Sequence, residues 1–421
     1  MTISKCYVWK WLKSETTPVV AGVLSIDGDQ QSFAYGRKYL EREDAEPIYA
    51  AELALSSGTK SPISGMKNFS CLRDSSPDAW GRRVINARLL SKDERETDLT
   101  EIVYLMNSAS DRIGSLDFQK SNTEYIPRET DSATLDDLFR ASLVVGEGGI
   151  IPPDLDSALF HGSSIGGARP KAMINDGEFK YIAKFSASDD TYDVVKSEFV
   201  AMKLAALSGI NVADIKMMES CGKDVLLVKR FDRDKVDNGW IRKSIVSGLT
   251  VLGLDEAWAS EASYENLLEE IRLNSIDFNK DSNELFSRMA FNVLIGNTDD
   301  HARNHAFYVR GDKIELTPAY DICPQRRTGG EASHGMKMHG DIRRSQINVC
   351  VNAAKNFGIS KSAAIEIISN QITIIHGNFE LVCDEINVPE VTRRLLMGRT
   401  IFNDFIFYDG YESLNPKSTR N

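Results

Sequence analysis

The first part of the chain alternates apolar and polar residues in the way that is typical of β-strands. Residues 3–24 carry this pattern, Asp27 and Gly28 follow as a turn, and a further strand is predicted over residues 33–39. Residues 78–90 instead repeat apolar side chains at helical spacing. The chain is therefore predicted to begin with a mainly β region that includes a short helix.

The middle of the chain predicts a β-hairpin followed by an amphipathic helix. Residues 172–185 alternate on either side of an Asp-Gly dipeptide, which is typical of a hairpin turn. Residues 193–208 repeat apolar side chains at helical spacing, and Asp193 is placed to cap the start of that helix. Two more strands are predicted after this helix, over residues 215–219 and 225–228.

Helical patterns dominate the chain after residue 244. Residues 283–295 are apolar nearly all round, which indicates a helix that is buried on every side. A strand-rich first half followed by a helical second half is the order of an α+β protein. The polar stretch at residues 119–135 is a candidate linker. The other helices are predicted over residues 135–145, 264–273, 361–375 and 390–400.

The composition of the chain excludes some functional classes. Its 421 residues include 50 Lys and Arg and 61 Asp and Glu, which gives a net charge of −11, and 42% of them are hydrophobic. This is the composition of a folded protein with two or three structural units. The acidic balance argues against binding of nucleic acid or an anionic membrane through bulk charge.

The cysteines and the apolar runs predict the cellular compartment. Six cysteines are scattered along the chain without a CxxC pair, which argues against a zinc knuckle or a dithiol redox site. We therefore expect buried free thiols in a reducing cytosol. The chain starts without the apolar run of a signal peptide, and no stretch reaches the ~20 apolar residues that a membrane helix needs. A cytoplasmic protein without membrane partners is predicted.

Residues 296–322 carry the strongest candidate for chemistry. Asp299 and Asn304 stand five positions apart, the D-x-x-x-x-N spacing with which kinase catalytic loops supply a base and a Mg²⁺ ligand. A hairpin is predicted next, and Asp321 after it offers a second hard oxygen ligand for Mg²⁺. A lone D-x-x-x-x-N is common by chance. In this chain a buried helix is predicted before the motif, and a hairpin and Asp321 follow it. This combination favours phosphoryl transfer.

Residues upstream supply the other groups that nucleotide binding needs. Lys184 ends a strand in the sequence Tyr-Ile-Ala-Lys, which is similar to the kinase V-A-I-K element and can neutralise nucleotide phosphates. Glu198 lies on the next helix, where kinases place the partner carboxylate, although a solvated helix residue is an equal alternative. The backbone from Lys229 to Phe231 follows a buried strand and can hydrogen-bond adenine.

A glycine-containing loop precedes the predicted hairpin. Glycines permit close approach of the backbone, whose N–H groups can then cradle phosphate oxygens. The loop fits neither the Walker nor the dinucleotide pattern, and by itself it is more typical of an ordinary flexible loop. Its residues are Ser163, Ser164, Ile165, Gly166, Gly167, Ala168, Arg169, Pro170 and Lys171.

In combination, these motifs resemble the HipA family of bacterial serine/threonine kinases, the toxins of type II toxin–antitoxin pairs, which are linked to bacterial persistence. Each motif alone has low specificity, and the resemblance comes from their order along most of the chain. The family loop S-x-x-G-A-x-x-K matches residues 164–171, its catalytic loop TDGHAKN matches 298–304, and its metal segment L-T-P-x-Y-D-I matches 316–322. Its hinge E-R-F-D-R matches 229–233, and its amino-terminal subdomain resembles 77–82 and 111–116.

The resemblance implies an α+β, two-lobed protein-kinase-like fold. A mainly β amino-terminal subdomain is expected over residues 1–125 and a nucleotide-binding lobe over 135–233. A helical lobe with the catalytic loop and the metal site is expected over 240–421. The implied activity is that of an ATP- and Mg²⁺-dependent protein serine/threonine kinase.

The resemblance also implies roles for particular residues and the nature of the partners. Asp299 would be the catalytic base, and Asn304 and Asp321 would bind Mg²⁺ and thereby the nucleotide. Ser164, or Ser163 before it, would be autophosphorylated. The implied partners are a HipB-like helix-turn-helix antitoxin, operator DNA reached mainly through that antitoxin, and a protein substrate, expected to be an aminoacyl-tRNA synthetase. The ATP-binding residues would be Lys184, Gly166, Gly167, Ala168, Lys229 and Phe231.

The sequence departs from the family pattern at several positions. Asp300 replaces the glycine of the catalytic loop, which adds a carboxylate beside the expected metal site. Lys229 replaces the hinge glutamate. His301 is expected to be a structural hydrogen-bonding group rather than an acid–base catalyst.

The sequence leaves two other functions open as alternatives. The chain can act mainly as a co-repressor module bound to the antitoxin, a property that can coexist with kinase activity. It can also be a small-molecule phosphotransferase with the same two lobes.

Overall fold

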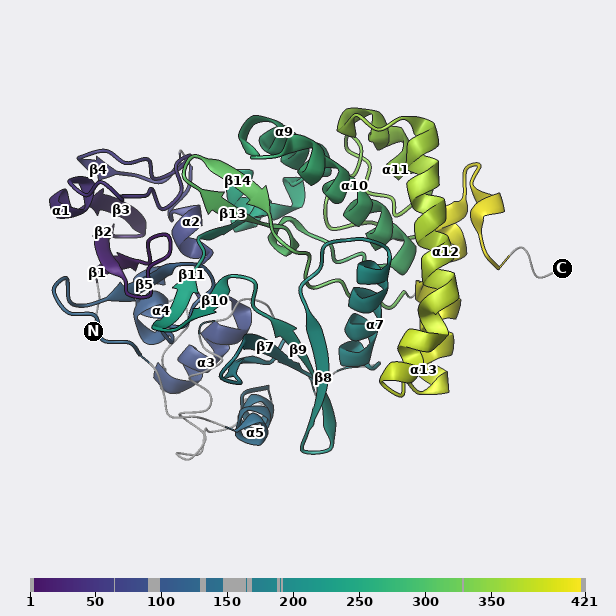
Figure 1. The fold of residues 1–421 in the computed structure, drawn as a ribbon, viewed down its shortest axis with the longest axis horizontal. Helices are drawn as coiled ribbons and strands as arrows, with labels where there is room; N and C mark the ends of the chain where they lie inside the picture. The colour runs from purple at the N-terminus through teal and green to yellow at the C-terminus, as the bar shows by residue number, and fades with distance from the viewer. Residues whose placement is uncertain are drawn as a thin grey trace. The chain divides into compact units, whose positions relative to one another are not determined.

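The computed structural model describes residues 4–63, 65–89, 99–128, 134–146, 164, 169–187, 190, 192–327 and 329–417 (Figure 1). Contacts divide the chain into two compact units. The first unit comprises Met1–Asp190, Met218–Val246 and Tyr308–Asp312. The second unit comprises Thr191–Met217, Ser247–Phe307 and Lys313–Asn421. The three ranges predicted from the sequence divide the chain differently and stay a prediction.

A five-stranded sheet of order β4-β3-β2-β1-β5 opens the first unit. Neighbouring strands are antiparallel, with Val8 opposite Gly22. A side chain at Gly22 would collide with the Ala34 carbonyl oxygen and the Phe33 ring, so this strand position requires glycine. The strands are β1 (Lys5–Lys10), β2 (Val19–Asp27), β3 (Gln30–Tyr35), β4 (Thr59–Lys60) and β5 (Leu116–Gln119).

The predicted strand over residues 33–39 is too long. The strand ends at Tyr35, and the chain turns into α1 (Arg37–Leu40). Tyr39 is thereby placed where its ring stacks on that of Tyr35, with centroids 5.6 Å apart. The helices that follow along the chain are α2 (Ser70–Arg73), α3 (Ala79–Leu89) and α4 (Glu101–Asn107).

The second sheet of the first unit has four strands in the order β6-β7-β9-β8. It contains the hairpin predicted from the sequence, with Ala172 opposite Ala183. Asp176 forms the turn, because its carboxylate accepts a hydrogen bond from the backbone N–H of Phe179 at 2.7 Å. The strands are β6 (Lys171–Asn175), β7 (Lys180–Phe185), β8 (Ile215–Ser220) and β9 (Lys223–Lys229), and β10 (Arg233–Val236) and β11 (Gly239–Arg242) follow as a separate hairpin.

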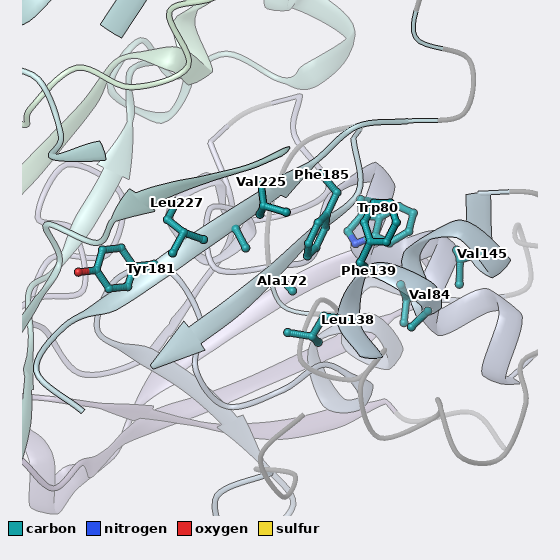
Figure 2. Packing of buried hydrophobic residues seen from close by; sticks show 12 residues of the cluster. Trp80, Val84, Leu138, Phe139, Val145, Ala172, Tyr181, Phe185, Val225 and Leu227 are labelled. Atoms are coloured by element: carbon teal, nitrogen blue, oxygen red, sulfur yellow. The ribbon is translucent and has the colours of Figure 1, made fainter. Parts of the chain in front are cut away.

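One face of the four-stranded sheet packs on helices α3 and α5 (Leu135–Gly146) (Figure 2). The indole nitrogen of Trp80 donates to the carbonyl oxygen of Lys171 at 3.1 Å, which joins α3 to the sheet. Tyr181, Ala183 and Phe185 alternate along β7 toward this core. Because successive side chains of a strand point to opposite faces, Lys184 lies on the other face of the sheet.

The second unit is mainly helical. Its central helix α10 (Phe278–Ile295) is buried along most of its length, as the apolar pattern predicts. Asp277 caps its start by accepting from Lys280 N at 3.1 Å, and Gly296 ends it in the left-handed conformation. The other helices are α7 (Val194–Leu207), α8 (Gly248–Val251), α9 (Tyr264–Asn274), α11 (Ile347–Ala353), α12 (Lys361–Glu385) and α13 (Glu390–Leu395).

Short segments complete the fold. The hairpin predicted after the catalytic motif is present as β13 (Ala306–Arg310) and β14 (Lys313–Leu316), and β12 (Ile245–Ser247) precedes α8. Short 3-10 helices occur at Glu256–Glu261, Ala302–Asn304, Ala354–Phe357, Asp404–Phe407 and Glu412–Leu414, and a π turn at Leu396–Thr400. Among the helices of the described residues, none has the length and apolar character needed to cross a membrane.

A buried ion pair holds β5 in the first unit. The Asp117 carboxylate accepts from Arg112 Nε at 2.9 Å and from Arg128 Nη2 at 2.7 Å. Burial alone would raise the pKa of Asp117, but the two guanidinium groups hold that pKa below its ordinary value. Asp117 is therefore an ion at neutral pH, and Arg112 depends on it for its charge partner.

We expect Asp117→Ala to lower the free energy of unfolding of the first unit by about 3–5 kcal/mol, because it leaves Arg112 buried without its counter-ion. Urea unfolding followed by tryptophan fluorescence measures this, since Trp9, Trp11, Trp80 and Trp240 lie in the first unit. The control is Glu41→Ala, which removes an exposed ion pair with Arg37 and should cost less than about 1 kcal/mol. Equal losses in the two variants would contradict the assignment.

The pKa of Asp117 also predicts a pH dependence. A carboxyl whose pKa is lower in the folded state stabilises the fold fully above its unfolded value of about 3.9 and loses this contribution as the pH falls further. The difference in stability between the wild type and Asp117→Ala should therefore be constant from pH 7 to about 5 and should shrink toward pH 2. A difference that grows on acidification would show that the carboxyl is protonated in the fold.

Candidate active site

The loop between α10 and β13 carries the first group of predicted site residues. Asp299 is exposed at its start, whereas the side chain of the next residue, Asp300, is buried. The Asn304 Nδ2 atom donates to the backbone oxygen of Asp299 at 3.3 Å. An amide whose nitrogen donates within the loop keeps its oxygen as an acceptor. The structure therefore brings Asn304 next to Asp299, as the motif predicts.

Two glycines from other parts of the second unit hold the ends of this loop. Gly335 N donates to Thr298 O at 3.0 Å, and Gly248 N donates to His305 O at 2.6 Å. A Cβ at Gly335 would lie 2.8 Å from the backbone oxygen of Asp300, and one at Gly248 would lie 2.6 Å from a loop carbonyl oxygen. Both positions therefore require glycine, because the backbones approach too closely for a side chain.

The segment that carries Asp321 is fastened to the same loop. The hydroxyl of Tyr320 donates to Arg303 O at 2.7 Å, and Gln325 N donates to Gly296 O at 3.0 Å. Asp321 itself has φ +61°, a left-handed conformation that is uncommon outside glycine and is often found at functional sites. The structure thus places the Asp321 segment against the loop of Asp299 and Asn304.

The donor atoms of this region fit magnesium. Asn304 and Asp321 offer oxygen atoms, the ligand type that Mg²⁺ prefers, and Mg²⁺ at nucleotide sites takes its other ligands from phosphates and water. Among the described residues, no group of three or more His, Cys, Asp or Glu side chains is arranged to hold a metal ion. Binding of Mg²⁺ with a nucleotide by Asn304 and Asp321 stays a prediction.

Asp300 faces the interior of the second unit instead of the expected metal site. Its carboxylate accepts a hydrogen bond from the Tyr264 hydroxyl, and His305 Nε2 lies 3.1 Å from its other oxygen. Burial alone would raise the pKa of Asp300, but His305 is the main cause that holds this pKa below its ordinary value. Burial lowers the pKa of the nearby His334 to about 4, so this ring is neutral at pH 7.

His301 lies beside a surface pocket next to the loop. The pocket is entirely within the second unit, and its mouth carries an ion pair between Arg303 and Glu256, 3.0 Å apart. The Nδ1 atom of His301 is buried without a hydrogen-bond partner in the described part of the chain. The hydrogen-bonding role expected for His301 stays a prediction. The pocket is lined by Leu249, Glu256, Ala259, Ser260, His301, Ala302, Arg303 and Gly335.

The predicted nucleotide-binding residues of the hinge lie in the first unit. The Nζ atom of Lys229 is 3.8 Å from the centre of the Phe179 ring, a cation–π contact. The backbone N–H of Arg230 donates to Lys180 O at 2.8 Å, and the carbonyl oxygen of Phe231 accepts from the Tyr308 hydroxyl at 3.1 Å. Two backbone groups of this hinge therefore already have partners within the fold.

The predicted site residues are distributed over both units. Lys184 lies half-buried on β7 of the first unit, where it pairs in register with Leu226. Asp299, Asn304 and Asp321 belong to the second unit. Glu198 on α7 also belongs to the second unit, and its side chain is buried, so it is not the solvated helix residue of the alternative interpretation.

Within residues 163–168 of the glycine-containing loop, the structure describes Ser164. Its side chain is 2% exposed, and its hydroxyl donates to the backbone oxygen of Asp111 at 3.1 Å. The predicted residues Ser163, Gly166, Gly167 and Ala168 lie outside the described residues.

The charged residues of the hinge motif form a buried network that sequence reasoning missed. The Asp111 carboxylate pairs with Lys180 at 2.7 Å, Arg230 at 2.9 Å and Arg233 at 3.0 Å. Asp232 pairs with both arginines at 2.7 Å. Burial alone would raise both pKa values, but the arginines hold the pKa of Asp232 at about 2 and that of Asp111 well below its ordinary value. Three charged residues directly after a buried strand were the available signal.

Comparison with known proteins identifies the family. The family model described as the HipA-like C-terminal domain matches residues 163–378, slightly more than half of the chain. The serine/threonine-protein kinase toxin HipA of Shewanella oneidensis is 28% identical in an alignment of 191 residues. This alignment covers 38% of this chain and 42% of that protein. The toxin YjjJ of Escherichia coli is 24% identical over 266 residues, 58% of this chain and 56% of that protein.

A solved structure matches nearly the whole fold. It is the Shewanella oneidensis HipA in a complex with HipB and its operator DNA, and it superposes with a TM-score of 0.70 at 18% identity. The match covers 92% of this chain and 94% of that chain, which confirms the α+β kinase-like fold expected from the sequence. In sequence, the chain spans only about two fifths to a little over half of these curated relatives. Because the family model covers more than half of it, the chain belongs to the HipA family.

Proposed function

We propose that the chain is an ATP- and Mg²⁺-dependent protein serine/threonine kinase and the toxin of a type II toxin–antitoxin pair. Its membership of the HipA family supports the class. One observation carries the chemistry: Asp299 is exposed on a loop in which Asn304 is hydrogen-bonded to its backbone, and the Asp321 segment is fastened to that loop. These contacts support the proposal, because phosphoryl transfer needs a base close to oxygen ligands for Mg²⁺.

In this proposal some residues position the reacting groups and others stabilise the charge of the phosphates. Asp299 accepts or orients the proton of the acceptor hydroxyl, and its exposure lets a polypeptide reach it. Asn304 and Asp321 would hold Mg²⁺, which supplies positive charge to the phosphate oxygens. Lys184 neutralises the nucleotide phosphates, and the Lys229–Phe231 backbone would face adenine. Backbone N–H groups at Gly166, Gly167 and Ala168 would cradle the phosphates.

Autophosphorylation would regulate this activity. The described position of Ser164 is buried against Asp111, so its hydroxyl has to leave this contact before it accepts a phosphate. A phosphate adds about −1.5 to −2 charges, which repel the phosphates of a nucleotide bound nearby. Modification of Ser164, or of Ser163, is thus expected to inactivate the kinase.

Family membership also suggests the partners. The matching HipA structure holds HipB and operator DNA, and we propose a HipB-like helix-turn-helix antitoxin for this chain. The net charge of −11 favours contact with DNA mainly through that antitoxin. The proposed substrate is an aminoacyl-tRNA synthetase. Assembly of the chain on operator DNA with an inactive kinase site would favour the alternative function, that of a co-repressor module.

Asp299→Asn should abolish phosphate transfer, because an amide cannot accept the hydroxyl proton. Incubation with ATP and Mg²⁺, followed by intact-mass measurement, should show addition of phosphate to the wild type only. The control is Asp312→Asn, which removes an exposed carboxylate from the β13–β14 turn and should retain wild-type transfer. Undiminished autophosphorylation of Asp299→Asn would refute the assigned base.

Ser164→Ala should eliminate the added phosphate, whereas Ser163→Ala should retain it, because Ser164 occupies the serine position of the family loop. Peptide mapping of the two variants, together with a panel of aminoacyl-tRNA synthetases as substrates, measures both acceptors. Loss of the phosphate in Ser163→Ala instead would move the modification to Ser163. Phosphate on no protein, with turnover of a small hydroxyl compound, would support the small-molecule phosphotransferase.

A further inference from the structure

We propose that Asp300 is a positioning residue, which through Tyr264 and His305 sets where the loop presents Asp299 and Asn304. The proposal deepens the proposed kinase function and rests on it. It concerns the residue that directly follows the proposed base Asp299.

Asp300 and His305 form a contact across the loop, and we call this contact the brace. Asp299 and Asn304 stand five positions apart, and so do Asp300 and His305, each directly following one of them. His305 Nε2 lies 3.1 Å from Asp300 Oδ1. This contact thus joins the two positions next to the proposed base and Mg²⁺ ligand, and it limits how far apart these can move.

The second carboxylate oxygen of Asp300, Oδ2, fixes the orientation of the Asp300 side chain. Oδ2 accepts the hydrogen bond from the hydroxyl of Tyr264, so both carboxylate oxygens have partners on different elements. A carboxylate held at both oxygens cannot rotate freely about its side-chain bonds. Its burial, with 2% of the residue exposed, makes loss of either partner costly, because a buried charge needs compensation.

The partners of Asp300 are themselves anchored. Tyr264 begins α9, where Ser263 caps the helix and Tyr264 N donates to Lys337 O at 2.9 Å. The Tyr264 and His305 rings meet edge to face with centroids 5.5 Å apart. Because the backbone oxygen of His305 also accepts from Gly248, the brace ends on groups that cannot easily shift.

The direction of Asp299 follows from the burial of Asp300. Asp300 is drawn into the protein, while the side chain of Asp299 is exposed. If the carboxylate of Asp300 is removed, the backbone at this point can rotate, and Asp299 no longer has a fixed direction. A displacement of about 1 Å in a reacting group can cost ~100-fold in rate.

The test compares Asp300→Gly, Asp300→Asn and Tyr264→Phe with the wild type. Asp300→Gly, which removes the whole side chain, should lower the single-turnover rate of autophosphorylation at saturating ATP by at least about tenfold. Tyr264→Phe should lower it less, and Asp300→Asn should recover most of the rate, because its amide oxygen can still accept the hydrogen bond from the Tyr264 hydroxyl. The ATP concentration at half-saturation should change less than twofold, while the Mg²⁺ requirement rises.

The matched control is Tyr39→Phe, which removes a buried tyrosine hydroxyl that donates to Glu46 O in the first unit. It should destabilise the protein without altering the rate or the Mg²⁺ requirement. Thermal unfolding shows whether each variant is folded. If Asp300→Gly does not fold, Tyr264→Phe is the variant that tests the proposal. Wild-type rates in both Asp300→Gly and Tyr264→Phe would overturn the proposal. So would a rate in Tyr39→Phe that falls as far as the rates of these two variants.

A second measurement separates this inference from the proposed function. Hydrogen exchange of the backbone amides in residues 298–305 should accelerate in Asp300→Gly and Tyr264→Phe but not in Tyr39→Phe, whether or not the chain transfers phosphate. If the wild type transfers no phosphate, the proposed kinase function fails while the exchange data still decide whether Asp300 braces the loop. Unchanged exchange in the loop would overturn the brace.

Discussion

The candidate site depends on two backbone hydrogen bonds, from Gly335 N to Thr298 O and from Gly248 N to His305 O. They hold both ends of the loop between α10 and β13 to segments that are distant in sequence. At each contact the backbones are so close that a Cβ would collide, which makes the path of the loop a property of the packing. The exposure of Asp299 and the burial of Asp300 follow from that path.

Charge is used differently in the two units. In the first unit, Asp117 and Asp232 are buried and Asp111 is half-buried against arginines, and the three carboxylates join strands to loops. A buried carboxylate is tolerated there because cations lie within hydrogen-bonding distance, and this holds the pKa values of all three below the ordinary range. In the second unit, Asp300 has an equivalent role with a tyrosine and a histidine, while Asp299 stays at the surface.

Local patterns predicted the elements well and their ends less well. The hairpin of β6 and β7, the Asp193 cap of α7 and the buried helix α10 were all confirmed, because turn chemistry, capping and periodicity act within a few residues. The helix predicted over 361–375 continues to Glu385, and the one predicted over 390–400 passes into a π turn after Leu395. These ends depend on packing partners elsewhere in the chain, which periodicity does not contain.

The sequence by itself determined the α+β class, the family and the spacing of Asp299, Asn304 and Asp321, because residue type and order are enough to recognise a phosphoryl-transfer motif. Only the tertiary structure decided which of the adjacent residues Asp299 and Asp300 faces solvent. It also decided that Ser164 is buried against Asp111 and that the charges of the hinge motif pair inside the first unit. The physical reason is that burial and counter-ions come from residues far apart in sequence, so no local pattern records them.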